Sequence, residues 1–240
     1  MKVGTLERQA ALSSTIAAAG SQAEVLAAVV RAAQAFGFTY VTLMVKPTDE
    51  DEYMAGLIIQ STLPADFVRE FDRNRFLVKC PVLPTLFDTM LPQVWTLEDM
   101  ERADMPPAML SLMRRFSLFA TAVMPLHSLD GERFLLRFDG QRAPLHQSEV
   151  NEFAMISLHA FDVFEKIRRT DRIAIPSPLS MRELEVVRWT AQGKTSVEIG
   201  RILSLSDHTV NAHMTNAIKK LDCVNRTQLV AKAIRLGLIA

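Results

Sequence analysis

Apolar residues in the first 170 positions recur with two different spacings. Between Ser21 and Phe36 they return every three or four residues, Ser21 and Glu24 have the spacing of a capping box, and Gly37 follows, which predicts a helix. The same spacing predicts further helices at 6–19, 64–75, 107–115 and 147–169. Runs rich in β-branched and aromatic residues predict strands at 38–45, 56–61, 120–126 and 132–138.

The last two predicted strands are joined through Asp130-Gly131, a turn dipeptide that favours an antiparallel hairpin. Residues 80–95 are punctuated by proline and carry no predicted element. Helices before and after an antiparallel sheet predict an α+β fold, specifically an α-β-α sandwich, for the N-terminal part of the chain.

The pattern changes after residue 170. The stretch RRTDRIAIPSP, residues 168–178, is charged and then proline-punctuated, which is typical of an interdomain linker. We therefore expect a domain at 1–170, a linker at 171–178, and an all-α domain of four helices at 179–240.

Local signals define the helices of the second domain. Ser180 with Glu183, and Thr195 with Glu198, have capping-box spacing, and Ser206 can cap a third helix. Two helices joined by a tight turn at 204–206 predict a helix-turn-helix. The residues expected to face inward are Leu184, Val187, Ala191, Ile199, Ile202, Leu203, Val210, Met214, Ala217 and Leu221.

The outward face of the third helix carries hydroxyls, amides and cations. After Asp207 it contains no acid; its residues are His208, Thr209, Asn211, Ala212, Thr215, Asn216 and Lys219. Such a face can donate to phosphates and contact base edges. A merely solvated bundle face would mix Glu with Lys, so the pattern favours DNA.

The formal net charge is zero, which hides an asymmetry between the two domains. From Leu179 onward nine Lys and Arg stand against five Asp and Glu, whereas the preceding residues carry 18 basic and 22 acidic side chains. The basic balance of the C-terminal segment indicates a polyanionic partner for that segment alone.

Motifs argue against several other classes of protein. Cys80 and Cys223 lie far apart with no Cys or His at ligand spacing, which indicates free thiols and neither a metal site nor a cofactor. The tripeptide Gly-Lys-Thr at 193–195 is also the end of the phosphate-binding loop of nucleotide-binding proteins. That loop needs a glycine five positions before the Gly-Lys pair, where this chain has Arg188. No Ser-His-Asp or Cys-His motif predicts an enzyme. The apolar run 36–45 is too short to cross a bilayer and no secretory signal is evident, so we expect a cytoplasmic protein without membrane contact.

The C-terminal segment closely resembles the LuxR-type DNA-binding domain. The matching positions are Leu179, Arg182-Glu183, Glu185-Val186, Gly193-Lys194-Thr195, Glu198-Ile199, Leu203, Ser206, Thr209-Val210, His213, Lys220-Leu221, Asn225-Arg226 and Gly237-Leu238. The resemblance implies that double-stranded DNA contacts Lys194, Thr195, Ser196, Thr209, Asn211, His213, Thr215, Lys219 and Lys220. Within this set it implies that Asn211 and Thr215 point at bases, while His213 has an equal alternative in packing within the domain.

The same resemblance implies that the last helix, 227–236, pairs with its twin and that the operator is dyad-symmetric. The pairing leaves open a homodimer or a heterodimer with a related regulator. RNA polymerase is a further partner that the resemblance allows.

The N-terminal segment resembles the autoinducer-binding domain of quorum-sensing regulators, with informative departures. Where that family carries Tyr, Trp, Tyr and Asp-Pro to bind an acyl-homoserine lactone, this chain has Leu63, Phe67, Phe71 and Cys80-Pro81. Each change removes a group that would hydrogen-bond the lactone, which weakens lactone binding by roughly 1 to 3 kcal/mol. Ser117 and Thr121 replace glycines, and Trp95 keeps its place.

Three interpretations follow for the pocket positions, which are Leu63, Phe67, Phe71, Cys80, Trp95 and Thr121. We favour a pocket filled by the protein itself, so that folding and dimerisation need no lactone. A second interpretation is an open pocket that holds a less polar molecule, and lactone sensing ranks third.

Overall fold

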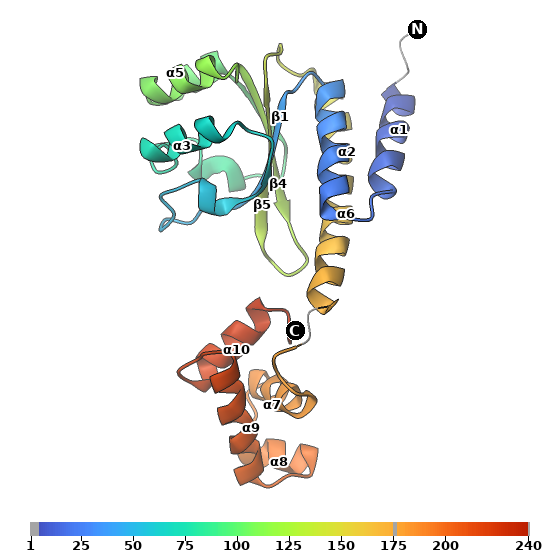
Figure 1. Cartoon of the computed structure of the whole chain (residues 1–240), viewed down its shortest axis with the longest axis vertical. Coiled ribbons are helices and arrows are strands. Elements are labelled where there is room, and N and C mark those ends of the chain that lie inside the picture. The colour runs from blue at the N-terminus through green and yellow to red at the C-terminus, as the bar shows by residue number, and fades with distance from the viewer. Residues whose placement is uncertain (1–4, 175–176, 240) are drawn as a thin grey trace. The chain divides into compact units, whose positions relative to one another are not determined.

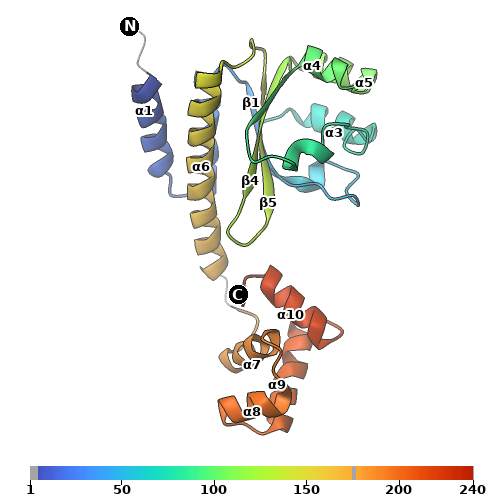
Figure 2. The same cartoon turned by 180° about the vertical axis from the view of Figure 1, so that it is seen from behind.

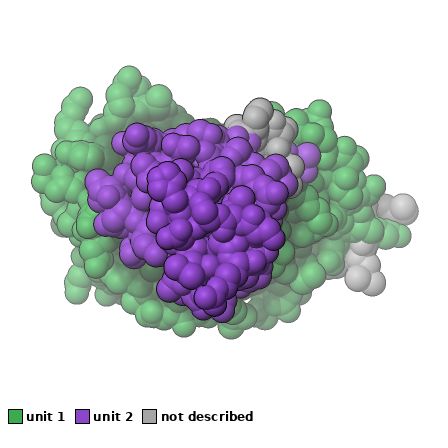
Figure 3. All heavy atoms as spheres, turned by 90° about the horizontal axis from the view of Figure 1, so that it is seen from below, with its two compact units in different colours: residues 1–169 green, residues 170–240 purple. Residues whose placement is uncertain are grey.

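The computed structural model of this chain describes residues 5–174 and 177–239. They divide into two compact units, residues 1–169 and 170–240, which Figure 3 colours separately. No helix in the described ranges is long and apolar enough to span a bilayer.

The first unit is built on a five-stranded antiparallel sheet with the strand order β2-β1-β5-β4-β3. The strands are β1 (Tyr40–Val45), β2 (Ile58–Ser61), β3 (Gln93–Thr96), β4 (Ala120–His127) and β5 (Arg133–Gly140). The β4–β5 hairpin pairs Ala120 with Gly140 through to His127 with Arg133, and Gly131 in its turn has φ of 83°. This confirms the predicted antiparallel hairpin.

Helices cover both faces of the sheet, as Figures 1 and 2 show from opposite sides. On one face lie α1 (Thr5–Ala17), α2 (Gln22–Ala35) and α6 (Gln147–Ala174). On the other lie α3 (Ala65–Arg73), α4 (Leu97–Arg102) and α5 (Pro107–Arg115), with short 3-10 turns η1 (Ala55–Leu57) and η2 (Pro84–Phe87). The predicted α-β-α sandwich is confirmed.

Each face of the sheet has its own apolar core. Beneath α2 and α6, Phe36, Phe38, Phe138 and Phe153 form an aromatic cluster in which the rings of Phe138 and Phe153 lie 4.3 Å apart. The opposite core, beneath α3–α5, is rich in Met and Leu. Because both faces are covered, β4 is buried along almost its whole length and shows no polar alternation.

The second unit consists of α7 (Met181–Ala191), α8 (Ser196–Leu203), α9 (Asp207–Lys220) and α10 (Arg226–Arg235). The capping boxes of α7 and α8 and the Ser206 cap of α9 form as expected. The unit closes around a core that includes Val186, Val187, Ile199, Val210 and Leu229. Four helices enclosing one core confirm the predicted all-α fold of this unit.

Several local predictions are wrong. Ala191 and Ile202 were expected to face inward, but both are exposed, and Val186 and Thr190 are buried on α7 instead. The Glu24 carboxylate accepts from the backbone N–H of Gly20, so only the Ser21 half of that capping box forms.

Three elements and one boundary differ from the sequence expectation. The proline-punctuated region contributes η2 and leads into β3, and α4 follows with a capping box between Thr96 and Asp99. Helix α6 runs to Ala174, so the predicted linker 171–178 is helical at its start, while its residues 175 and 176 lie outside the described ranges.

Candidate functional site

The turn between α8 and α9 depends on a close approach of two backbone segments. Ser204 ends α8 in the left-handed region, with φ of 56°, and the N–H of Leu205 returns to donate to the carbonyl of Gly200 at 2.8 Å. A Cβ placed on Gly200 would lie 2.6 Å from the Leu205 carbonyl oxygen. Gly200 was not among the residues predicted to be important, although an isolated glycine within a helical pattern is a signal for such an approach.

We expect Gly200→Ala to destabilise the second unit by about 1 to 3 kcal/mol, because the added methyl meets backbone rather than a movable side chain. Urea unfolding followed in this unit measures the effect. Gly56→Ala is the matched control, since a Cβ at Gly56 meets nothing within 4 Å. Equal stabilities of the two variants would contradict the role given to Gly200.

Helix α9 presents an exposed polar face that one hydrogen bond ties to α8. Ser196 Oγ donates to Asn211 Oδ1 at 2.7 Å, while Asn211 itself is exposed. The bond orients the carboxamide and leaves its nitrogen, with two N–H donors, for another partner. One turn further on, the hydroxyl of exposed Thr215 donates to the backbone carbonyl of Asn211 at 2.9 Å. The oxygen of Thr215 therefore keeps its lone pairs for an incoming donor.

The other implied DNA contacts surround this face. Lys219 is exposed, His213 and Lys194 are half-buried, and Thr195 caps α8 with its hydroxyl 2.8 Å from Glu198. The Thr209 hydroxyl lies 2.8 Å from that of Ser206. All nine implied residues belong to α8, α9 or the segment before α8.

Lys220 also has a partner inside the unit. Its Nζ lies 2.7 Å from Oε2 of Glu183, whose side chain is 4% exposed. Burial of the Glu183 carboxylate raises its pKa, but hydrogen bonds from Lys220 and Ser180 outweigh burial, and the net pKa is lowered from its usual value. The contact joins the start of α7 to the end of α9, so Lys220 supports the unit whether or not it touches DNA.

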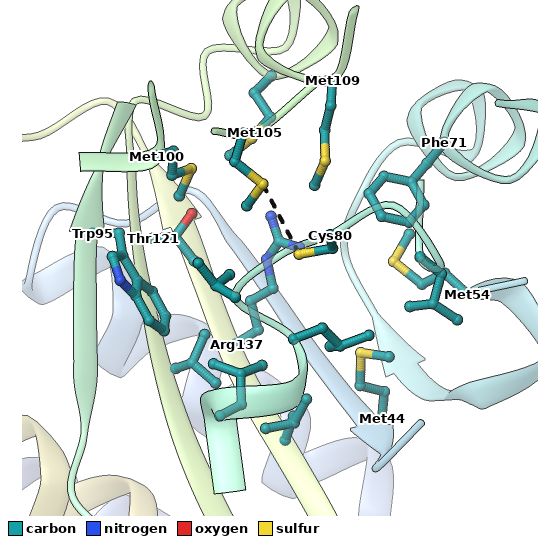
Figure 4. Close-up of a pocket in the computed structure, with 17 residues that line it drawn as sticks. Met44, Met54, Phe71, Cys80, Trp95, Met100, Met105, Met109, Thr121 and Arg137 are labelled. Atoms are coloured by element: carbon teal, nitrogen blue, oxygen red, sulfur yellow. Dashed lines mark hydrogen bonds between the residues drawn. The ribbon is translucent and has the colours of Figure 1, made fainter. Parts of the chain in front are cut away.

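A cavity of about 70 Å³ lies in the first unit between the sheet and α3–α5. Four of the six predicted pocket residues line it, namely Phe71, Cys80, Trp95 and Thr121 (Figure 4). Leu63 and Phe67 do not line it; they are buried in the adjoining core. Leu63 and Phe67 therefore pack within the apolar core beneath α3–α5.

Methionine dominates the cavity wall. Six of the twelve methionines in the chain line it: Met44, Met54, Met100, Met105, Met109 and Met113. The Cys80 sulfur lies 4.0 Å from the sulfur of Met105. Burial raises the pKa of the Cys80 thiol, which keeps it protonated and unreactive.

A buried ion pair at one wall of the cavity was missed by sequence analysis. Arg137, on β5, donates through Nε and Nη2 to Asp139 at 2.8–3.0 Å, and Thr121 Oγ1 donates to the same carboxylate at 2.7 Å. The Asp139 side chain is 0% exposed and that of Arg137 is 16% exposed. The available signal was the appearance of two charges, Arg137 and Asp139, in the otherwise apolar stretch 134–140.

Comparison with known proteins identifies both units. The family model of the autoinducer binding domain matches residues 21–164, and that of the bacterial regulatory proteins of the luxR family matches residues 177–233. The chain belongs to the LuxR family. This LuxR-family chain is a quorum-sensing-type transcriptional regulator with an autoinducer-binding domain and a DNA-binding domain, and it is not an enzyme.

Relatives match this LuxR-family chain over most of their length. The HTH-type quorum sensing-dependent transcriptional regulator RpaR of Rhodopseudomonas palustris is 32% identical over 206 residues, which cover 85% of this chain and 83% of the relative. The transcriptional activator protein BjaR1 of Bradyrhizobium diazoefficiens is 28% identical over 208 residues, covering 85% and 84%. The crystal structure of Escherichia coli SdiA has the same fold, with a TM-score of 0.73 at 24% identity over 99% of this chain and 100% of that one.

Proposed function

We propose that this regulator binds a dyad-symmetric operator as a dimer and that its first domain folds without acyl-homoserine lactone. In this proposal residues 1–170 form the sensor and dimerisation domain and residues 179–240 the DNA-binding domain. The observation that carries the lactone-free part is the Arg137–Asp139 pair, through which the protein itself satisfies the buried carboxylate beside the cavity.

The DNA-binding part rests on the exposed face of α9. The Asn211 nitrogen can donate to an adenine edge, and its Oδ1 has a second lone pair, beside the one bonded to Ser196, that can accept from the same base. Asn211 is therefore the first candidate for sequence specificity. Thr215 stands one turn along the same face, and Lys194, Thr195 and Lys219 lie where they can neutralise or bond phosphates. The relatives RpaR and BjaR1, a transcriptional regulator and a transcriptional activator, support this function. In this proposal the protein acts on DNA in the cytoplasm.

Two features of the cavity oppose lactone binding. Its volume of about 70 Å³ is about half that of the engineered cavity of about 150 Å³ that holds a single benzene, and a lactone with an acyl chain is larger than benzene. In addition, Asp139 already accepts from Arg137 and Thr121, so it has little capacity left for the amide N–H of a ligand. A ligand N–H buried without an acceptor costs about 1 to 3 kcal/mol.

Dimerisation is supported by the apolar surface of the second domain around α10. Ile234 is 51% exposed and Leu236 is 48% exposed, although Leu229 and Ala233 of the same helix are fully buried. Pairing of α10 with a twin would cover Ile234 and Leu236 and set two α9 helices about one DNA turn apart. RNA polymerase is a further partner in this proposal.

The protein made in a host without lactone synthesis should be soluble and dimeric, and it should contain no stoichiometric lactone. Light scattering measures the mass, and solvent extraction followed by mass spectrometry detects any bound small molecule. One lactone per chain, or aggregation that added lactone relieves, would overturn ligand-free folding. A monomer that binds DNA only with a related regulator present would replace the homodimer by a heterodimer.

A further inference from the structure

The guanidinium of Arg137 retains hydrogen-bonding capacity that faces the cavity. Its Nε and Nη2 are engaged by Asp139, but within the described residues no acceptor is bonded to Nη1. Figure 4 shows the guanidinium pointing toward Cys80 and Met105, away from the backbone of β5. A guanidinium N–H that faces a cavity and has no protein acceptor is, in native proteins, usually bonded to water or to a ligand.

The charge around the cavity is balanced. Among the described lining residues only Arg137 and Cys80 are titratable, Cys80 is a neutral thiol, and Asp139 offsets the charge of Arg137. An anionic ligand would therefore bring an uncompensated charge into an apolar site, which is strongly unfavourable. A neutral molecule meets no such penalty.

The walls can adapt to a small occupant. Methionine is unbranched and flexible and has a polarisable sulfur, so a wall with six methionines can close on ligands of different shape. The empty space is about 70 Å³, which suits a molecule of a few heavy atoms, or a slightly larger one after rotamer changes.

We propose that this cavity binds a small uncharged molecule that is apolar apart from one hydrogen-bond acceptor, such as a ketone, ester or ether oxygen, which accepts from Arg137 Nη1. The inference goes beyond ligand-free folding, because the occupant is an addition to a domain that is already folded. It names a ligand chemistry without the N–H donor and the long acyl chain of an acyl-homoserine lactone.

The test uses the full-length protein with ¹³C-labelled methionine methyl groups and three probes. Acetone carries the acceptor, propane is the same carbon skeleton without it, and acetate is an anion of similar size. We expect acetone to shift methyl signals of the cavity methionines in a saturable manner, propane to bind about tenfold more weakly, and acetate not to bind. The exposed Met90 and Met181, at 77% and 73% exposure, are internal controls that should not respond.

A paired variant locates the preference at Arg137. In Arg137→Met/Asp139→Asn the buried charges are removed together, so the variant should fold while the preference for acetone over propane disappears. Equal binding of acetone and propane by the wild type, tighter binding of acetate, or no saturable shift with any probe would each overturn the proposal. None of these results would touch the proposed DNA binding, which is measured on a different domain.

Discussion

The double substitution Asn211→Ala/Thr215→Ala should lower affinity for the operator by on the order of a hundredfold, because each good base contact contributes about 1 to 3 kcal/mol of discrimination. Both side chains are exposed on α9, so truncation creates no cavity in the core. The operator is the sequence that the wild-type protein selects from random DNA, and fluorescence anisotropy gives the dissociation constants. Affinity for unrelated DNA should change little, because phosphate contacts remain.

The control for this variant is Asn151→Ala, which removes an exposed amide from α6 in the first domain. It should leave operator affinity unchanged. If the α9 variant retained wild-type affinity for the selected operator, α9 would not be the element that reads the sequence.

Arg137→Met should destabilise the first domain by about 3 to 5 kcal/mol, because it leaves the fully buried Asp139 carboxylate with Thr121 alone as a side-chain partner. Adding Asp139→Asn should recover most of the loss, since the uncompensated charge is then removed. Urea unfolding followed in the first domain measures both variants. The second domain should unfold as in the wild type.

A loss below about 1 kcal/mol for Arg137→Met, comparable to an exposed ion pair, would mean that the Asp139 carboxylate is solvated in the native state. The protein would then not satisfy that carboxylate by itself. The proposal of lactone-free folding would lose its main support.

Much of the second domain could be predicted because its signals are local. Ser180, Thr195 and Ser206 each start a helix through a hydrogen bond to a residue three positions on, and this spacing is visible in the sequence. Burial was predicted less well. Ile202 is apolar and was placed inside, but its exposure is decided by where α8 lies against α9 rather than by residue type.

In the first domain the missed features depend on contacts distant in the sequence. Strand β3 is short and follows prolines, and it is stabilised by pairing with β4, from Gln93 opposite Val123 to Thr96 opposite Ala120. From the sequence alone, a charged residue such as Asp139 is expected to face solvent. Pairing of β4 with β5 instead places Thr121 opposite Asp139, and the two side chains are hydrogen-bonded. Four of the six predicted pocket residues line the cavity because the family resemblance supplied the alignment, whereas Arg137 was not among the positions that the resemblance supplied.

The most direct measurement is selection of DNA from a random pool by protein made in a lactone-free host. We predict enrichment of a dyad-symmetric sequence, with half-sites about one helical turn apart, and no further enrichment when lactone is added. Enrichment that appears only with added lactone, or no enrichment by a soluble folded protein, would contradict this prediction.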